Sequence, residues 1–159
     1  MQGRILYPLN KLKDQYPGIY SKKAAKYQDR EGVQERVIPH LNCRWNDVLF
    51  LCPVYPGKII GKLREIGYSY PAEKFYEIDT GLLTHDKIAV LTYPGNGIEP
   101  QYLHQSPACM PGISELPVAT EDYFKDCYAQ KKRFLLFAYI PHVLYLGNVN
   151  TEHCPIVEC

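Results

Sequence analysis

Two stretches of the sequence carry the residue types best suited to chemistry. In the segment 94–117, Glu99 and His104 lie five positions apart. A histidine titrates near neutral pH and can move a proton, and a carboxylate can orient it or act as a second acid–base group. Upstream, Arg44 and Asp47 come just before an apolar run. The arginine fork suits a phosphate or a carboxylate, and the aspartate can act as a base. The candidate catalytic residues are therefore His104, Glu99, Arg44 and Asp47.

The same residues also have interpretations without chemistry. A proline-stiffened loop with an exposed histidine accounts for the first stretch. A turn at Asn46 and Asp47, with Arg44 in solvent and Trp45 in the core, accounts for the second. Both alternatives stay open at the level of sequence.

Tyrosine is the prominent aromatic residue, with 14 Tyr against 5 Phe and 1 Trp. Its ring is apolar and its tip polar, which suits ligand pockets and partner surfaces as well as a core with a wet edge. The segment 94–117 holds five prolines and three glycines and shows no helical or strand period. We predict a long Pro/Gly-rich loop there, and loops of this length are usually functional or disordered. The candidate ligand-binding residues are Tyr93, Asn96, Tyr102 and Trp45.

The six cysteines do not form a metal-binding pattern. The residues with suitable ligand atoms are His142, His153, Cys154 and Cys159. No Cys-x-x-Cys spacing occurs, and His153 adjoins Cys154, so we predict no metal site. Cys109 is the one candidate nucleophile among the cysteines, because Cys52 and Cys127 fall on apolar patterns typical of packing thiols. No cofactor is indicated.

Charge and hydropathy limit the partners. The net charge is +1, whereas dedicated nucleic-acid binders usually carry a strong basic excess. The lysines between residues 11 and 30 alternate with tyrosines, a pattern that a solvated helix face also explains. No apolar run approaches the roughly 20 residues of a membrane span, and the N-terminus lacks a signal-peptide pattern. We expect a cytoplasmic protein with free thiols, which binds an unidentified small molecule or protein and can form a homo-oligomer.

The order of predicted elements indicates an α+β fold. Helices are expected at 17–27, at 56–66 and from Thr120, and the expected strands are at 3–7, 33–41, 48–54, 75–78, 88–93, 133–140, 143–146 and 156–157. Hydrophobic residues make up 46% of the chain, enough for one core. We predict a single globular domain over residues 1–159, with a mixed or mostly antiparallel sheet and about three helices packed on it.

Local signals mark some of these elements sharply. Pro56 suits the first turn of a helix, and Gly67 suits its C-terminal cap. Thr120 is predicted to cap the start of the last helix through its hydroxyl group. The run 48–54 is uniformly apolar and bounded by polar turns, which favours a strand buried on both faces.

The segment 48–67, an apolar strand, a proline turn and a helix ending in Ile-Gly, resembles the first strand and helix of small ADP-ribosyltransferase-like toxins and RNA 2′-phosphotransferases. The resemblance implies a grip on NAD or phosphate, with Arg44, Thr80 and Glu115 matched by their order. The strand carries no His or Arg of its own, and neither Ser-Thr-Ser nor Glu-x-Glu occurs.

Standard signatures of nucleotide, zinc-protease and serine-hydrolase sites are also missing from the sequence. Three hypotheses follow. The first is a small ligand- or partner-recognition domain with a Tyr-rich site near 94–117. The second is a small transferase or hydrolase acting on a nucleotide-like substrate. The third is a structural or oligomer-forming protein without a small-molecule site.

Overall fold

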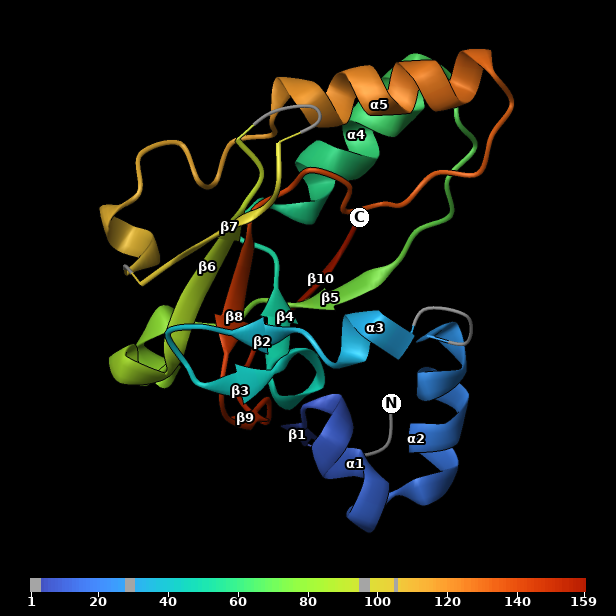
Figure 1. Ribbon diagram of the computed structural model, residues 1–159. Helices are drawn as coiled ribbons and strands as arrows, with labels where there is room; N and C mark the ends of the chain where they lie inside the picture. Colours follow the sequence, from blue (N-terminus) through green and yellow to red (C-terminus); the bar gives the residue numbers. More distant parts are fainter. Residues whose placement is uncertain (1–3, 28–30, 95–97, 105) are drawn as a thin grey trace.

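A four-stranded antiparallel sheet lies at the centre of the molecule (Figure 1). The computed structural model describes residues 4–27, 31–94, 98–104 and 106–159. The strands are β4 (Leu49–Leu51), β8 (His142–Tyr145), β6 (Ile88–Thr92) and β7 (Gln101–Leu103), in that spatial order. Apolar and β-branched residues dominate β6 and β8, which suits strands covered on both faces. The predicted α+β class with an antiparallel sheet is confirmed.

The two faces of this sheet pack against different parts of the chain. Because side chains alternate along a strand, Ala89, Leu91 and Leu144 share one face. The hairpin of β2 (Val37–Ile38) and β3 (Cys43–Arg44) lies near this face, and Ile38 packs on it, so we call it the hairpin face. Ile88, Val143 and Tyr145 define the opposite face, which packs against Leu6, Leu49, Leu51, Ile78 and Leu83.

The opposite face looks toward a two-stranded antiparallel ribbon. The ribbon consists of β5 (Lys74–Tyr76) and β10 (Ile156–Glu158), and Phe75 pairs with Val157 across it. We call the sheet face nearest to it the ribbon face. A separate short pair, β1 (Ile5–Leu6) with β9 (Val149–Asn150), joins segments from opposite ends of the chain.

Two helices pack side by side at one end of the sheet (Figure 1). They are α4 (Pro56–Ile66) and α5 (Val118–Ala129). Ile59 and Leu63 of α4 meet Phe124 of α5 in one buried cluster. The predicted limits of α4 are confirmed, with a proline in the first turn and Gly67 capping the end at φ 113°.

Short N-terminal helices lie at the other end of the sheet (Figure 1). They are α1 (Leu9–Gln15), α2 (Pro17–Ala24) and α3 (Glu31–Gln34). The helix expected over 17–27 ends at residue 24, and neither α1 nor α2 has a fully buried residue. Tyr27 is buried in the 3₁₀ turn that follows α2. Among the described residues, no helix has the length and hydropathy needed to cross a bilayer.

The segment 94–117 is not the unstructured loop that its proline and glycine content predicts. Strand β7 forms inside it, with Tyr102 paired to Leu91 and Leu103 to Val90. A 3₁₀ turn follows at Pro107–Cys109. The sequence did not predict β7, because the edge of β6 supplies its hydrogen-bonding partners from outside the segment.

The expected strand at 133–140 is also absent: the residues there form irregular backbone and turns. Tyr139 has a φ of 59°, a left-handed conformation that no strand contains. Phe134, Leu136 and Ile140 instead pack into the cluster between α4 and α5. The apolar run reflects burial rather than sheet pairing.

Two further expectations need correction. The run 33–41 is not extended throughout, because it starts in α3 and reaches β2 only at Val37. The run 48–54 contains the expected strand, but β4 is an edge strand and Phe50 remains 36% exposed.

The last helix starts at Val118 rather than at Thr120, and Pro117 occupies the capping position. Thr120 is fully buried, and its hydroxyl donates a 2.9 Å hydrogen bond to the carbonyl of Ala138. Thr120 therefore ties α5 to the irregular segment beside it instead of capping its own helix.

Thr120→Val should lower the free energy of unfolding by about 1–3 kcal/mol, because the Ala138 carbonyl loses its donor inside the core. Urea unfolding measures the change. Thr84→Val is the matched control, since Thr84 is exposed and its contact to Tyr145 is 3.5 Å long. An effect at Thr120 as small as that at Thr84 would contradict the assignment.

Candidate ligand pocket

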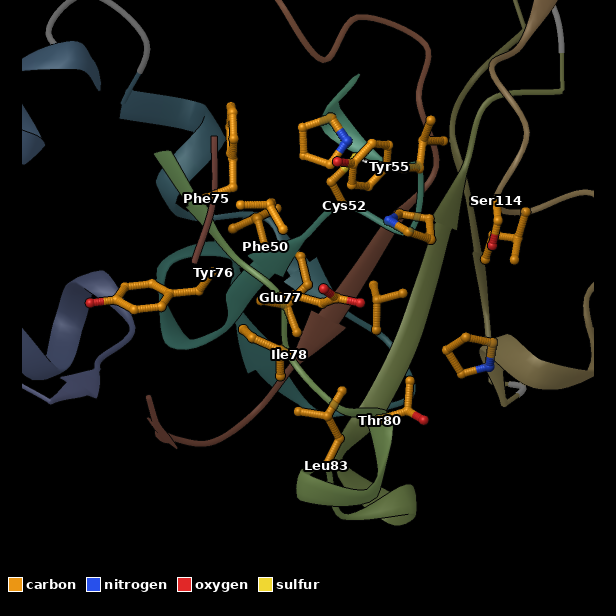
Figure 2. Close-up of a pocket in the computed structure, with 18 of the residues that line it drawn as sticks. Phe50, Cys52, Tyr55, Phe75, Tyr76, Glu77, Ile78, Thr80, Leu83 and Ser114 are labelled. Atoms are coloured by element: carbon orange, nitrogen blue, oxygen red, sulfur yellow. Dashed lines mark hydrogen bonds between the residues drawn. The ribbon is translucent and has the colours of Figure 1, made fainter. Parts of the chain in front are cut away.

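An open pocket of about 720 Å³ lies between the ribbon face of the sheet and the β5–β10 ribbon. Figure 2 shows its lining side chains, which come from β4, β5, the start of α4 and the segment 107–114. Its volume falls within the roughly 300–1,000 Å³ usual for small-molecule sites. The pocket is therefore large enough for a drug-sized ligand.

Apolar side chains form most of the pocket. Leu51 and Val143 line it from the central sheet, and Ile78 and Leu83 line it from the segment after β5. Phe75 of β5 also lines the pocket, whereas Phe50 and Phe137 border it and turn their rings toward His142. Water is in contact with this apolar surface while the pocket is empty. Covering the surface with an apolar group lowers the free energy.

Polar groups interrupt this lining at a few points. Tyr55, Glu77, Thr80 and Ser114 all line the pocket (Figure 2). Lys74 also contributes, but its ammonium group pairs with Glu158 at 3.5 Å. A mainly apolar cavity with a small number of placed polar groups is typical of small-molecule sites.

Tyr55 begins the wall at the start of α4 and is 52% exposed. A hydrogen bond and charge interaction with Cys159, together with desolvation and the charge of Glu77, raise the pKa of Tyr55 above its usual value. The Tyr55 hydroxyl thus interacts with Cys159, and its ring and the accepting lone pairs of its oxygen are what it offers to a ligand.

Cys52 lies in the wall just before Tyr55 and packs partly against the cluster between α4 and α5. Burial raises the pKa of the Cys52 thiol to about 11, although a hydrogen bond to the Val54 carbonyl, at 3.3 Å, acts in the opposite direction. The thiol is thus inert at neutral pH, as the apolar pattern around it indicates.

The predicted catalytic residues Arg44, at the end of β3, and Asp47, in the 3₁₀ turn that follows, lie close together, but both have structural partners. Arg44 pairs with Glu35 at 3.2 Å on the surface. The Asp47 carboxylate accepts hydrogen bonds from the Arg44 backbone N–H at 2.8 Å and from Asn10 at 2.7 Å. Desolvation and then the charge of Asp47 raise the pKa of Cys43 to about 11.

His104 and Glu99 are both exposed. The His104 ring stacks on that of His40, with 5.4 Å between the ring centroids. Within the described part of the chain, no hydrogen bond or ion pair joins His104 to Glu99, Arg44 or Asp47, and none of the four lines the pocket. Their catalytic role stays a prediction.

The predicted ligand-binding residues Tyr93, Tyr102 and Trp45 share one location. All three pack against the core of the hairpin face, on the opposite side of the sheet from the pocket. Burial raises the pKa values of Tyr93 and Tyr102, and the charge of Arg36 opposes it. Asn96 lies outside the described residues.

His142 lies among aromatic rings next to the hairpin face. Its ring meets Tyr93 and Phe50 edge-on, at centroid distances of 6.3 Å and 6.1 Å. Burial lowers its pKa, although the Ile140 carbonyl opposes this, and its Nδ1 atom has no hydrogen-bond partner among the residues that the structure describes. The histidine is therefore held in its neutral form.

Sequence reasoning missed Glu77, Tyr55 and Ser114. The available signal was the charge of Glu77 at a position that shares one face of an extended segment with Phe75. The segment 94–117, which the sequence singled out, contributes Pro107, Ala108, Ile113 and Ser114 to the lining of the pocket.

The residues matched through the resemblance are scattered. Thr80 lines the pocket, while Arg44 pairs with Glu35 and Glu115 pairs with Lys58 at 2.9 Å. In the described ranges, no three His, Cys, Asp or Glu side chains gather closely enough to hold a metal ion.

Comparison with known proteins returned no match to a family model, to a curated protein or to a solved structure. The functional argument therefore depends on the geometry of the pocket.

Native-state alkylation with iodoacetamide at pH 7.5 should modify Cys109 well before Cys52. Cys109 is exposed, whereas a thiol with a pKa of about 11 is ionised in only roughly one molecule in three thousand at that pH. The Cys52 rate should rise about tenfold per pH unit toward pH 11. Peptide mass spectrometry measures both rates, with urea-unfolded protein as the control. Equal native rates would show that the wall around Cys52 is open.

Proposed function

We propose that this chain is a small-molecule-binding domain and that its ligand occupies the pocket on the ribbon face. The observation that carries the proposal is an open cavity of about 720 Å³ whose lining is mainly apolar. Leaving apolar surface in contact with water opposes folding by roughly 25 cal/mol per Å², and a ligand that covers the surface recovers that free energy.

The origin of the walls supports binding by a preformed site. Val143 belongs to a strand paired on both sides, and Phe75 belongs to the paired β5–β10 ribbon. Tyr55 immediately precedes α4, whose apolar side is anchored in the core. Because separate, ordered elements hold these side chains, a ligand would not have to order them on binding, and this reduces the entropic cost.

Binding is favoured over catalysis by the chemistry of the lining. The acid–base groups suggested by the sequence, His104, Glu99 and Asp47, do not line the pocket. The cysteine in its wall, Cys52, is a protonated thiol at neutral pH. The pocket thus offers shape, apolar surface and hydrogen-bonding groups for recognition.

The neutral dye Nile red should bind with one site per chain, and its emission should shift to the blue because the apolar lining replaces part of the water around the dye. Ala108→Phe should weaken binding by about tenfold or more, since the new ring would occupy the pocket. Ala108 is exposed in a 3₁₀ turn, so the melting temperature should change little.

The matched control is Ala129→Phe, which places the same ring at an exposed position on α5 outside the lining. It should leave the affinity for Nile red unchanged. The proposal would be contradicted if both variants weakened Nile red binding equally, or if neither variant weakened it. A dimer seen by light scattering, with dye binding only to monomer, would instead indicate that a second copy fills the pocket.

A further inference from the structure

Glu77 is the feature of the pocket that apolar recognition does not explain. It follows β5, where successive side chains point to opposite sides of the backbone. Figure 2 shows its carboxylate in the middle of the pocket, whereas the Tyr76 ring extends away from the centre. A purely apolar ligand would gain nothing from the negative charge of Glu77, and it would have to displace water that hydrates this carboxylate.

The cations around the pocket already have carboxylate partners. Lys74 pairs with Glu158 at 3.5 Å, and Lys58, two residues into α4, pairs with Glu115 at 2.9 Å. Glu77, by contrast, makes no side-chain hydrogen bond or ion pair to any described residue. Glu77 is an exposed residue, so the pocket contains one carboxylate that no described side chain neutralises and that an incoming ligand can reach.

The rings near this carboxylate add a second preference for positive charge. Tyr55 is close enough for the charge of Glu77 to act on its phenol. Phe75, two positions before Glu77 in the same extended segment, also lines the pocket. The face of an aromatic ring attracts a cation, and combinations of rings with a carboxylate are suited to organic ammonium groups.

We propose that the ligand is an organic cation with an apolar body, an inference that rests on the proposed binding function. Glu77 holds the ammonium group, with the Tyr55 hydroxyl and ring beside it. The apolar body lies against Leu51, Val143 and Ile78. An anionic ligand of the same shape is rejected, because its charge would face a carboxylate while both lost water.

Three compounds with one body and different head groups test this: 4-phenylbutylamine, 4-phenylbutan-1-ol and 4-phenylbutyrate. Two-dimensional ¹⁵N–¹H NMR titration at pH 7 measures weak affinities and locates the perturbed residues. The amine should bind about tenfold more tightly than the alcohol, and the carboxylate about tenfold more weakly than the alcohol. The shifted resonances should belong to residues that line the pocket.

The substitution Glu77→Gln should abolish the difference in affinity between the three compounds. The affinity of the amine should fall about tenfold while that of the alcohol changes less than about twofold, because only the charge is lost. Asp126→Asn is the control, since it makes the same change in net charge on the exposed side of α5, outside the lining. It should leave all three affinities unchanged.

The outcomes separate the two proposals. If amine and alcohol bind equally, or if Glu77→Gln weakens both alike, the inference about a cation is wrong and the proposed binding function stands. If neither Nile red nor any of the three compounds perturbs the lining residues, the proposed function itself is wrong. If Asp126→Asn acts like Glu77→Gln, the preference reflects overall charge and the role of Glu77 is wrong.

Discussion

The antiparallel pairing of β6 with β8 is the interaction on which the rest of the structure depends. It joins Ile88 to Tyr145 and Val90 to Val143, and both strands are covered on both faces. Each strand then pairs with one outer strand, so neither has a free edge. The hairpin face receives the β2–β3 hairpin, and the ribbon face provides the floor of the pocket. A loss of this pairing would therefore remove the core and the site together.

The pocket exists because the ribbon face is covered incompletely. The β5–β10 ribbon has only two strands, and β4 has only three residues at the edge of the sheet. Between them, apolar side chains such as Leu51 and Phe75 are left partly open to solvent. In a domain of marginal stability, such surface is an energetic cost unless something covers it. The ligand proposed for the pocket would offset this cost, and the exposed carboxylate of Glu77, which no described side chain neutralises, is the reason for proposing a cationic head group.

Elements with strong local signals could be predicted from the sequence. Pro56 and Gly67 bound α4 because their effects on backbone conformation act within a few residues. The predicted strands at 75–78 and 88–93 correspond to β5 and β6 because β-branched and aromatic runs of that length favour extended backbone. The α+β class follows from the order of such elements. The candidate pocket could be predicted less well, since the sequence pointed to the segment 94–117 but to none of the pocket residues Tyr55, Glu77 and Ser114.

The sequence by itself determined which segments have helical or extended preference and which side chains need burial. The tertiary structure decided which partners those segments found. Residues 133–140 are apolar enough for a strand, yet they pack on α4 and α5, because burial can be satisfied without sheet pairing. Strand β7 forms against the local preference of a proline-rich segment, because β6 offers it hydrogen bonds. Glu77 faces a pocket only because β5 pairs with β10, about eighty residues away in sequence. Contacts over such separations depend on loop closure and packing across the whole chain, which no local pattern encodes.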